Sequence, residues 1–367
     1  MRVLSLFDGI ACAYTALKRA GFRIEKYYAS EIDKYAMAVA KKNYPDIVQV
    51  GDVRELKGED FKNIDLLIGG SPCTGLSIAR QNREGLKDKQ SCLFFEMVRL
   101  HKAIKLKWFL YENVASMAKD QEEIISKTIA DAEQKPIELI YFDAALVSAQ
   151  SRKRLFWTNI RNVEPPEDKG ILLKDILEDG VPAEYSRLRG VKWGKNKSTA
   201  LCASDWRGLN RNQNQTAVVQ IASFGKNRQA ERIYSVEGKS VSLRANAGGQ
   251  GAKCGLYLIN RDGHTNRFKR YDDKCPTLRG MVRMNNVSRC VNEKELLIRK
   301  LSPVECERLQ GCPDGYTAVG FDGDKEIQIS NTQRYKCLGN AFNVDVVAHI
   351  LKYINGRVPQ GTLLKNI

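Results

Sequence analysis

The alternation of short apolar runs with amphipathic stretches over the first 160 residues is the feature that most restricts the fold. Short apolar runs predict strands, and apolar positions three to four residues apart predict helices. The expected strands are Val3–Phe7, Tyr27–Ser30, Ile47–Val50, Ile64–Ile68 and Trp108–Tyr111, and the expected helices are Tyr14–Ala20, Lys34–Asn43, Leu93–Ile104 and Glu122–Ala132. Strands and helices that alternate at this spacing predict an α/β protein with a doubly wound, mostly parallel sheet.

The pattern breaks at Glu164-Pro165-Pro166-Glu167, which is typical of a linker. The stretch after about Glu184 is rich in Asn, Gln, Gly and Arg, with β-like runs at Thr216–Phe224 and Gly255–Ile259. Regular structure resumes near Glu293 and ends in an amphipathic helix, Val344–Ile354, whose apolar stripe predicts core packing. We therefore expect an α/β domain (1–175), a smaller, mainly β domain (176–295) and a return to the first domain (296–367).

Charge is distributed unevenly along the chain. The net charge is +16, yet Glu184–Cys290 alone holds 21 Lys/Arg and 7 Asp/Glu, whereas the rest holds 38 basic and 36 acidic residues. A neutral body with one strongly basic segment indicates contact with a polyanion such as nucleic acid. A basic face that only keeps the protein in solution is the alternative reading of the same charge.

Several classes of protein are disfavoured. The ten cysteines include no CxxC pair and only three histidines accompany them, which argues against zinc, gives no hint of a disulfide framework and favours a reducing interior. Asp8 interrupts the apolar N-terminal stretch, so no signal peptide is expected, and no run of about 18 apolar residues predicts a membrane span. We expect a soluble, cytoplasmic protein without a metal.

A candidate nucleotide site lies where the first three strands end. Leu4-Ser5-Leu6-Phe7-Asp8-Gly9 runs from a strand into a tight turn, but the GxGxxG of dinucleotide enzymes is missing. Glu31 follows the second strand, where a carboxylate can bind ribose hydroxyls, and Asp52 follows the third. Each residue alone is more often an ordinary turn or cap. Together they favour an adenosyl cofactor without phosphates.

Cys73 is the candidate nucleophile. Most cysteines are small buried apolar residues, but Gly69-Gly70-Ser71-Pro72 places this one on a rigid turn beyond a strand. That position should expose its sulfur in the same crevice as the cofactor. The polar and basic residues Thr74 to Ser91 follow, with Gly75 and Gly85 as hinges, and resemble a lid that closes over a substrate.

Two further blocks carry polar side chains near the strand ends. Glu112-Asn113-Val114 follows an apolar strand, and Gln150-Ser151-Arg152-Lys153-Arg154 leads into the extended segment Leu155–Ile160. Arg152 and Arg154 should lie on one side of that segment, because side chains alternate along an extended chain. Taken alone, either block would be read as a helix cap or a surface ion pair.

The complete set of blocks resembles the cytosine-C5 DNA methyltransferases. Phe7-Asp8-Gly9, Gly69–Cys73, Glu112–Val114, Gln150–Arg154, Arg308-Leu309-Gln310-Gly311 and Gly339-Asn340-Ala341-Phe342 occur in the order found in that family. The resemblance covers about 1–160 and 298–355. Ala11 and Cys12 depart from the family's Phe-x-Gly-x-Gly-Gly, which predicts a slightly altered turn. This variant looks closest to the vertebrate de novo enzymes, although the absence of an N-terminal extension suggests a bacterial or phage origin.

The resemblance implies the S-adenosylmethionine-dependent methyltransferase fold and methyl transfer to C5 of a flipped cytosine in double-stranded DNA. Cys73 would add to C6 of the cytosine, with its pKa lowered by amides or arginines. Glu112, protonated or sharing a proton with the base, would accept at N3 the electron density that this addition displaces. Arg154 would hold O2 and Arg152 the flipped nucleotide or its phosphate. The implied neighbours of S-adenosylmethionine are Phe7, Asp8, Gly9, Ile10, Glu31, Ile32, Asp52, Val53, Pro72, Leu93, Asn340 and Ala341.

The basic segment would recognise the target sequence. It contains three similar phrases, Lys197–Leu201, Lys239–Leu243 and Lys274–Leu278, whose recurrence by chance is an equal alternative. The hypothesis places Lys197, Lys239 and Lys274 on DNA phosphates and uses Arg244 or Arg279 to read a guanine edge. Ser77 and Arg80 of the lid are further expected nucleic-acid contacts.

Three other functions compete with this reading. A transfer-RNA cytosine methyltransferase would carry the same blocks, but the large basic insert favours duplex DNA. A catalytically silent DNA-binding homologue would not need Cys73, Glu112 and Arg154 together. A nicotinamide oxidoreductase would need the missing glycines. We expect a monomer on DNA in the bacterial nucleoid or a phage-infected cell, with a cognate restriction endonuclease as one conceivable partner.

Overall fold

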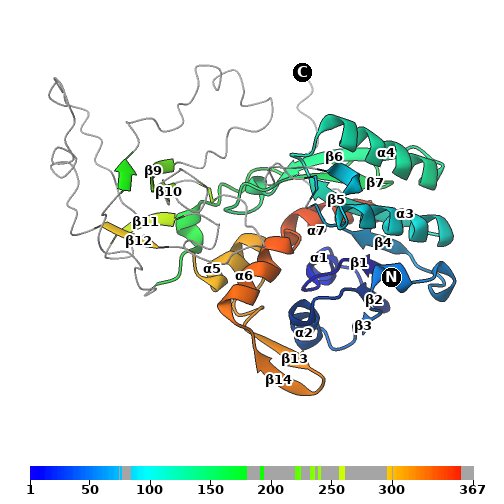
Figure 1. Ribbon diagram of the computed structural model, residues 1–367, viewed down its shortest axis with the longest axis horizontal. Coiled ribbons are helices and arrows are strands. Elements are labelled where there is room, and N and C mark those ends of the chain that lie inside the picture. Colours follow the sequence, from blue (N-terminus) through cyan, green and yellow to red (C-terminus); the bar gives the residue numbers. More distant parts are fainter. Residues whose placement is uncertain are drawn as a thin grey trace.

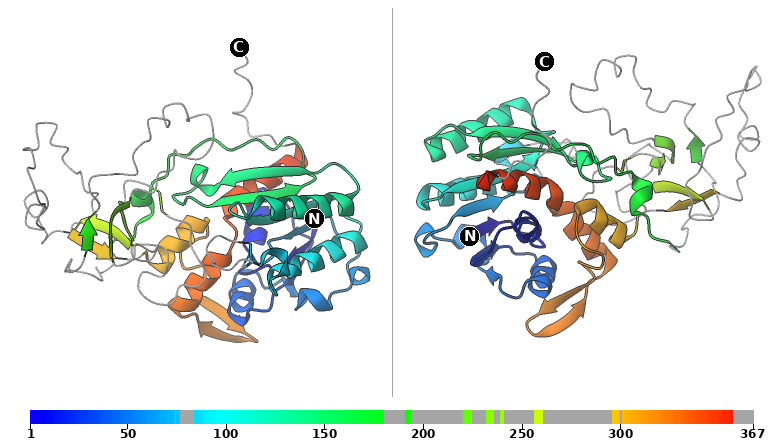
Figure 2. Two further views of the ribbon diagram at one scale, coloured as in Figure 1. Left: turned by 45° about the horizontal axis from the view of Figure 1, so that its top comes forward. Right: turned by 180° about the vertical axis from the view of Figure 1, so that it is seen from behind.

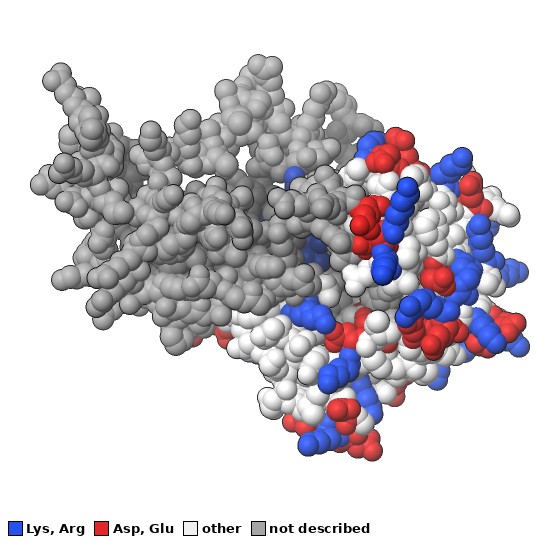
Figure 3. All heavy atoms as spheres, in the orientation of Figure 1, with Lys and Arg blue, Asp and Glu red and all other residues white. Residues whose placement is uncertain are grey.

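The computed structural model describes residues 1–73, 75–76, 84–179, 191–193, 220–224, 232–235, 239–240, 256–260, 296–299 and 301–356. Figure 1 shows an α/β body and, beside it, the short strands of a second sheet. On the face of the body drawn in Figure 3, Lys and Arg alternate with Asp and Glu, as the near-neutral composition of this part of the chain requires. No helix of the described part is long and apolar enough to cross a lipid bilayer.

The α/β body is built on a seven-stranded sheet with the strand order β3-β2-β1-β4-β5-β7-β6. The strands are β1 (Arg2–Leu6), β2 (Lys26–Ser30), β3 (Val48–Gln49), β4 (Leu66–Gly69), β5 (Trp108–Val114), β6 (Glu138–Asp143) and β7 (Lys153–Thr158). The first five are parallel, whereas β7 runs antiparallel between β5 and β6. The mostly parallel sheet predicted from the sequence is confirmed, and β6 is an additional strand.

Helices cover both faces of this sheet. The helices of the body are α1 (Cys12–Arg19), α2 (Lys34–Asn43), α3 (Phe94–Ala103), α4 (Lys119–Glu133), α5 (Pro303–Gln310), α6 (Asn331–Asn340) and α7 (Val344–Lys352). One apolar cluster joins one face to α1, α2, α5, α6 and α7, and a second joins the other face to α3 and α4. Along β1, Val3 belongs to the first cluster and Leu4 and Leu6 to the second, because side chains of a strand alternate. The sheet is therefore doubly wound.

The last helix completes the core of one face. Val344, Val347, Ile350 and Leu351 of α7 are at most 1% exposed, which confirms the packing role predicted for this stripe. The regular helix ends at Lys352, and a 3-10 turn (Tyr353–Asn355) follows it. Figure 2 shows α7 beside α1, and Arg19 of α1 forms a 2.7 Å ion pair with Asp345.

The described part of the basic insert contributes to a second sheet of five strands, ordered β12-β11-β10-β9-β8. They are β8 (Val191–Trp193), β9 (Gln220–Phe224), β10 (Arg232–Ser235), β11 (Leu256–Asn260) and β12 (Leu296–Arg299), and all neighbours except β10 and β11 are antiparallel. Because β12 pairs with β11, residues 296–299 belong to the sheet of the insert and not to the α/β body.

Short 3-10 turns and one hairpin join these elements. The turns are Val53–Glu55, Gly58–Asp60, Gly85–Lys87, Ser91–Leu93, Ala144–Leu146 and Leu173–Ile176, and the hairpin consists of β13 (Val319–Asp322) and β14 (Lys325–Gln328). The hairpin packs closely on α2, since a Cβ added at Gly320 would lie 2.8 Å from Ala38 Cβ. The return from the insert is thus fastened to the first third of the chain.

A buried carboxylate organises the segment after α5. Glu307 is 0% exposed, and its oxygens accept hydrogen bonds from the amides of Gly315 (2.7 Å) and Thr317 (2.8 Å) and from Arg334 (2.9 Å). Arg308, the next residue, forms an exposed ion pair with Asp314 at 2.6 Å. The Glu307–Arg334 and Arg308–Asp314 ion pairs are therefore close together, and the first is buried whereas the second is exposed.

Glu307→Ala should lower the free energy of unfolding by about 3–5 kcal/mol, because it leaves Arg334 and two amides without their acceptor in the interior. Asp314→Ala is the matched control and should cost at most about 1 kcal/mol, since its ion pair is exposed to water. Urea unfolding followed by circular dichroism measures both. Equal losses in the two variants would contradict this assignment of the buried carboxylate.

Candidate active site

The loop after β1 forms one wall of the candidate site. Phe7, Gly9 and Ala11 have φ of 55°, 62° and 60°, so three of five successive residues adopt the left-handed region. A Cβ added at Gly9 would meet nothing within 4 Å, which leaves the main chain there open to a ligand. Ala11 takes this conformation without being glycine, at a cost of about 1–2 kcal/mol. The loop therefore keeps a tight turn although two family glycines are replaced.

Glu31 ties this loop to the end of β2. Its Oε2 accepts a hydrogen bond from the amide of Gly9 at 2.9 Å, and its Oε1 accepts from the amides of Ile32 (2.7 Å) and Asp33 (2.8 Å). Ile32 itself is 70% exposed, which is unusual for a large apolar side chain. A half-exposed carboxylate beside an exposed apolar side chain fits the hydroxyls and the base of a nucleoside.

The neighbouring predicted cofactor residues differ in how far they reach the crevice. Asp52 is held by Arg54 in an ion pair of 2.5 Å, which keeps the pKa of Asp52 below its usual range, while Val53 is buried. Pro72 and Leu93 are half-buried, Asn340 is exposed and Ala341 is buried. Phe7, Gly9, Glu31, Ile32 and Asp52 thus gather at the carboxyl ends of β1 to β3, as predicted.

Asp8 and Ile10 face the interior instead. The Asp8 side chain is 4% exposed and accepts a 2.5 Å hydrogen bond from the Tyr27 hydroxyl, while Ile10 is 0% exposed. Burial raises the pKa of Asp8 to about 7, against the opposing effect of its hydrogen bonds. The prediction that these two residues contact the cofactor can therefore apply only to their main chain, because both side chains are packed in the core.

Cys73 lies beyond β4, on the turn predicted from its glycines. A Cβ added at Gly69 would lie 2.8 Å from the carbonyl oxygen of Leu6, and one at Gly70 would lie 2.8 Å from Glu112 Oε2 and 2.9 Å from Phe342 Cε1. The two glycines therefore let β1, Glu112 and Phe342 approach this turn closely. Asn113 fixes the turn from β5, since its Nδ2 donates to the Ser71 carbonyl (3.3 Å) and hydroxyl (3.2 Å).

The electrostatics of Cys73 differ from the prediction. Burial raises the pKa of the Cys73 thiol, Arg154 and Arg152 act in the opposite direction, and Glu112 adds to the increase. The lowered pKa expected from the sequence is therefore wrong for this structure, because removal of the thiolate from water outweighs the attraction of the arginines. The thiol is mostly protonated at neutral pH.

Glu112 and Arg154 form an ion pair at the strand ends. Glu112 Oε1 lies 2.6 Å from Arg154 Nε, and the two side chains are 15% and 16% exposed. Arg154 is paired with Val114 across β5 and β7, so Glu112 is its diagonal neighbour on the same face. The antiparallel insertion of β7 beside β5 therefore brings these two predicted residues together.

Arg152 occupies a different environment from Arg154. It is 4% exposed, and its guanidinium donates to the carbonyls of Gly339 (3.1 Å) and Ala341 (2.9 Å). Burial lowers its pKa to about 9, with repulsion from Arg154 as a further cause. The prediction that Arg152 holds the flipped nucleotide or its phosphate is not supported, because the guanidinium is engaged inside the protein with the last turn of α6 and with Ala341 after it.

Of the residues predicted to contact nucleic acid, Lys239 lies in the part of the chain that the structure describes. Ser77, Arg80, Lys197, Arg244, Lys274 and Arg279 lie outside the described residues. Lys239 is described and contradicts its prediction as a phosphate-binding lysine, because it is 4% exposed and donates to the carbonyls of Ala145 and Ser148. Within the described residues, no group of three or more His, Cys, Asp or Glu could hold a metal ion.

Three residues of the site were given no role from the sequence. Phe342 packs against the Gly70 turn and Asn113 holds Ser71, although both stand in recognised blocks. Asp143 accepts hydrogen bonds from the Arg152 amide (2.7 Å) and the Ser151 hydroxyl (3.0 Å). It ends β6, a strand that we did not predict, although the apolar run Leu139–Phe142 before it was a signal for one.

The doubly wound sheet, with β7 antiparallel between β5 and β6 and a crevice at the ends of β1 to β3, has the fold of S-adenosylmethionine-dependent methyltransferases. The fold is similar to solved structures of the Entamoeba histolytica methyltransferase EhMeth (TM-score 0.62, 16% identity, 97% of this chain and 98% of that one). It is also similar to the S. pombe Dnmt2 methyltransferase (TM-score 0.57, 16% identity, 96% and 97% covered).

Sequence comparison identifies the family. Residues 1–356 match the family of C-5 cytosine-specific DNA methylases. The type II methyltransferase M.FnuDI of Fusobacterium nucleatum is 30% identical over 371 residues, covering 96% of this chain and 94% of the relative. M.HhaI of Haemophilus parahaemolyticus is 27% identical over 374 residues, covering 96% and 93%. The chain belongs to the C-5 cytosine-specific DNA methylases, and its cofactor is S-adenosylmethionine.

Replacing Asp8 should change how stability depends on pH. A carboxyl with a pKa of about 7 in the folded protein keeps its proton at pH values where the unfolded chain has lost it. The contribution of the Asp8 carboxyl to the free energy of unfolding is therefore greatest near pH 4 and decreases as the pH rises towards 7. Asp8→Asn cannot titrate, so its stability relative to wild type should increase by about 2–4 kcal/mol between pH 5 and pH 8.

Unfolding midpoints at the two pH values measure this difference. Asp46→Asn is the control, because Asp46 is exposed, and its difference from wild type should be the same at both pH values. A constant difference for Asp8→Asn as well would show that the Asp8 carboxyl is ionised throughout.

Proposed function

We propose that this enzyme methylates C5 of a cytosine that has been flipped out of double-stranded DNA, through a covalent bond between Cys73 Sγ and C6 of the base. The observation that supports it is the convergence of a thiol, a carboxylate and a guanidinium from three separate blocks. Glu112 and Arg154 are 2.6 Å apart, and the Cys73 thiol lies close enough that both affect its pKa.

The geometry suggests how Cys73 is activated. C5 of cytosine is a weak nucleophile, and addition of a thiolate to C6 makes it an enamine-like carbon. Because burial keeps the thiol protonated, its proton must leave when the base arrives, and the positive charges of Arg154 and Arg152 favour the thiolate that results. A base bound in the site would exclude water and so strengthen this attraction, since charges interact more strongly where water is excluded.

Glu112 is placed to work at N3 of the base. Its Oε1 is held by Arg154, while its Oε2 faces the Gly70 turn that carries Cys73. Addition at C6 pushes electron density towards N3. The proton that leaves the Cys73 thiol passes to Glu112 and from it to N3, where it neutralises that charge. Arg154, which orients the carboxylate, would also hold O2 of the cytosine.

The remaining steps complete the exchange at C5. S-adenosylmethionine supplies the electrophilic methyl group that C5 takes. Loss of the C5 proton then restores the double bond between C5 and C6 and expels Cys73 as a thiolate. The residues that would hold the cofactor are those at the ends of β1 to β3, with the Glu31 carboxylate on ribose hydroxyls and Ile32 on the base.

Double-stranded DNA is the proposed substrate because the segment Glu184–Cys290 holds 21 Lys/Arg against 7 Asp/Glu, and phosphate neutralisation dominates DNA affinity. Relatives of similar length are named type II methyltransferases. We assign residues 1–175 and 300–367 to catalysis and residues 176–299, which include β12, to target recognition. A monomer on DNA, a bacterial or phage setting and a cognate endonuclease are parts of the same proposal.

Cys73→Ala should abolish methylation and still bind S-adenosylmethionine, because the thiol contacts the base and not the cofactor. On duplex DNA with 5-fluorocytosine, wild type should form an adduct that survives denaturation, since fluorine cannot leave as a proton. Cys92→Ala is the matched control, as Cys92 is also a partly exposed free cysteine nearby in sequence, and it should form the adduct. An adduct in Cys73→Ala, or methylation of transfer RNA but not DNA, would overturn the proposal.

Glu112→Gln should slow methyl transfer by about 10²-fold or more, the usual scale for loss of an acid or base group. Glu122→Gln removes a carboxylate that pairs with Lys119 on the surface of α4, and it should retain the wild-type rate. Incorporation of labelled methyl groups under single-turnover conditions measures both. A wild-type rate in Glu112→Gln would mean that another group serves N3.

A further inference from the structure

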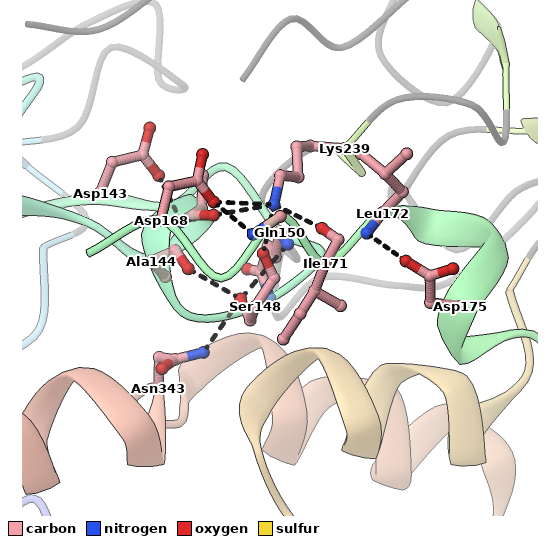
Figure 4. A network of polar contacts seen from close by, with 12 residues as sticks. Asp143, Ala144, Ser148, Gln150, Asp168, Ile171, Leu172, Asp175, Lys239 and Asn343 are labelled. Atoms are coloured by element: carbon pink, nitrogen blue, oxygen red, sulfur yellow. Dashed lines mark hydrogen bonds and ion pairs between the residues drawn. The ribbon is translucent and has the colours of Figure 1, made fainter. Parts of the chain in front are cut away.

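Lys239 of the basic insert lies inside the α/β body (Figure 4). Its ammonium donates to the carbonyls of Ala145 (2.9 Å), Ser148 (3.2 Å) and Ile171, and Asp168 lies 3.8 Å away. The side chain is only 4% exposed. One ammonium thus joins the insert to the turn after β6 and to the segment that leads out of the α/β body.

Ser240 continues this attachment through its main chain. Its amide donates to the carbonyl of Ala149 at 2.7 Å, and its carbonyl accepts from the amide of Ser151 at 3.0 Å. These two hydrogen bonds make a short parallel bridge beside Gln150. The insert therefore pairs with the residues immediately before Arg152.

The contacted segment leads directly to the arginines of the site. Arg152 follows Ser151, and its amide donates to Asp143 at 2.7 Å while its guanidinium reaches the carbonyls of Gly339 and Ala341. Two residues later, Arg154 pairs with Glu112. The stretch from Ala145 to Arg154 is thus held at one end by Lys239 and Ser240 and carries Arg154 at the other.

Burial of an ammonium is costly unless its protons find acceptors, so this arrangement is a specific one. Three carbonyls match the three donors of a lysine ammonium. Two of the carbonyls, those of Ala145 and Ser148, come from the loop that contains the short turn Ala144–Leu146, and the third, that of Ile171, comes from the segment that leads out of the α/β body. Without the cation, these carbonyls would face one another in the interior, and the loop would have to move to reach water.

We propose that Lys239 is a positioning residue for methyl transfer, which holds the Ala145–Ser151 segment so that Arg152 reaches the end of α6 and Arg154 takes its place beside Glu112. This inference rests on the proposed function. It assigns the insert a second task besides contact with DNA, because the catalytic arginine segment is complete only when the insert is attached. A displacement of about 1 Å at a reacting group can cost roughly 10²-fold in rate.

The test compares Lys239→Met with Lys239→Arg in the full-length protein. Methionine has a similar length and no charge, whereas arginine keeps a cation with several donors. Lys41→Met is the matched control, because Lys41 also donates to a main-chain carbonyl, that of Gly323 at 2.6 Å, far from the site. The measurements are kcat, KM for duplex DNA, and the Kd and stoichiometry of S-adenosylhomocysteine binding. The stoichiometry gives the folded fraction.

We expect kcat of Lys239→Met to fall at least about tenfold per folded molecule, with partial rescue in Lys239→Arg and no change in Lys41→Met. The Kd of the cofactor product should stay within about twofold, since the crevice at β1 to β3 is remote from Lys239. If Lys239→Met does not fold, Lys239→Gln, which keeps one donor group, is judged by the same criterion.

Two outcomes would overturn the inference. An unchanged kcat would show that the contact only stabilises the protein. A higher KM for DNA without a change in kcat would show that it only places the insert on DNA. Wild type is measured in the same series, so a wild type that neither methylates DNA nor forms the 5-fluorocytosine adduct would instead refute the proposed function.

Discussion

The hydrogen bonds from the Arg152 guanidinium to the carbonyls of Gly339 and Ala341 connect parts of the chain that are 187 and 189 residues apart. They seat the segment after α6 against the start of β7, and Phe342 of that segment then reaches the Gly70 turn. The Cys73 turn, the Glu112–Arg154 pair and the cofactor crevice therefore share one support. Because the guanidinium is buried, a partner lost at either end would leave an unpaired charge in the core.

Sequence patterns predicted the parts of the fold that depend on local chemistry. The bounds of α2 agree with the prediction, because Asp33 caps its first turn and Pro45 prevents its continuation. Most other helices and strands were placed within a few residues, and the Cys73, Glu112 and Arg154 cluster was assembled correctly from the resemblance and the topology. β6 was missed although Leu139–Phe142 is a short apolar run of the kind that predicts a strand.

Three charged side chains lie deeper in the protein than their charge suggested, and they share a physical cause. Lys239, Arg152 and Asp8 were read by their charge, which normally indicates exposure, yet each is at most 4% exposed. What makes their burial tolerable is a set of partners contributed by distant segments, such as the carbonyls around Lys239 or the Tyr27 hydroxyl at Asp8. The pKa of Cys73 was misjudged for the same reason, because burial depends on the whole site and not on the neighbouring residues of the chain.

The packing of α7 on α1 also has a consequence for synthesis of the protein on the ribosome. The sheet from β1 to β7 is complete once residue 158 has emerged, but one of its faces waits for helices near the end of the chain. At about 5–20 residues per second, the part of that face which α5, α6 and α7 cover stays exposed for roughly 10–40 s. Nascent chains of this enzyme should therefore be clients of ribosome-associated chaperones, and premature termination within the insert should yield an aggregating fragment.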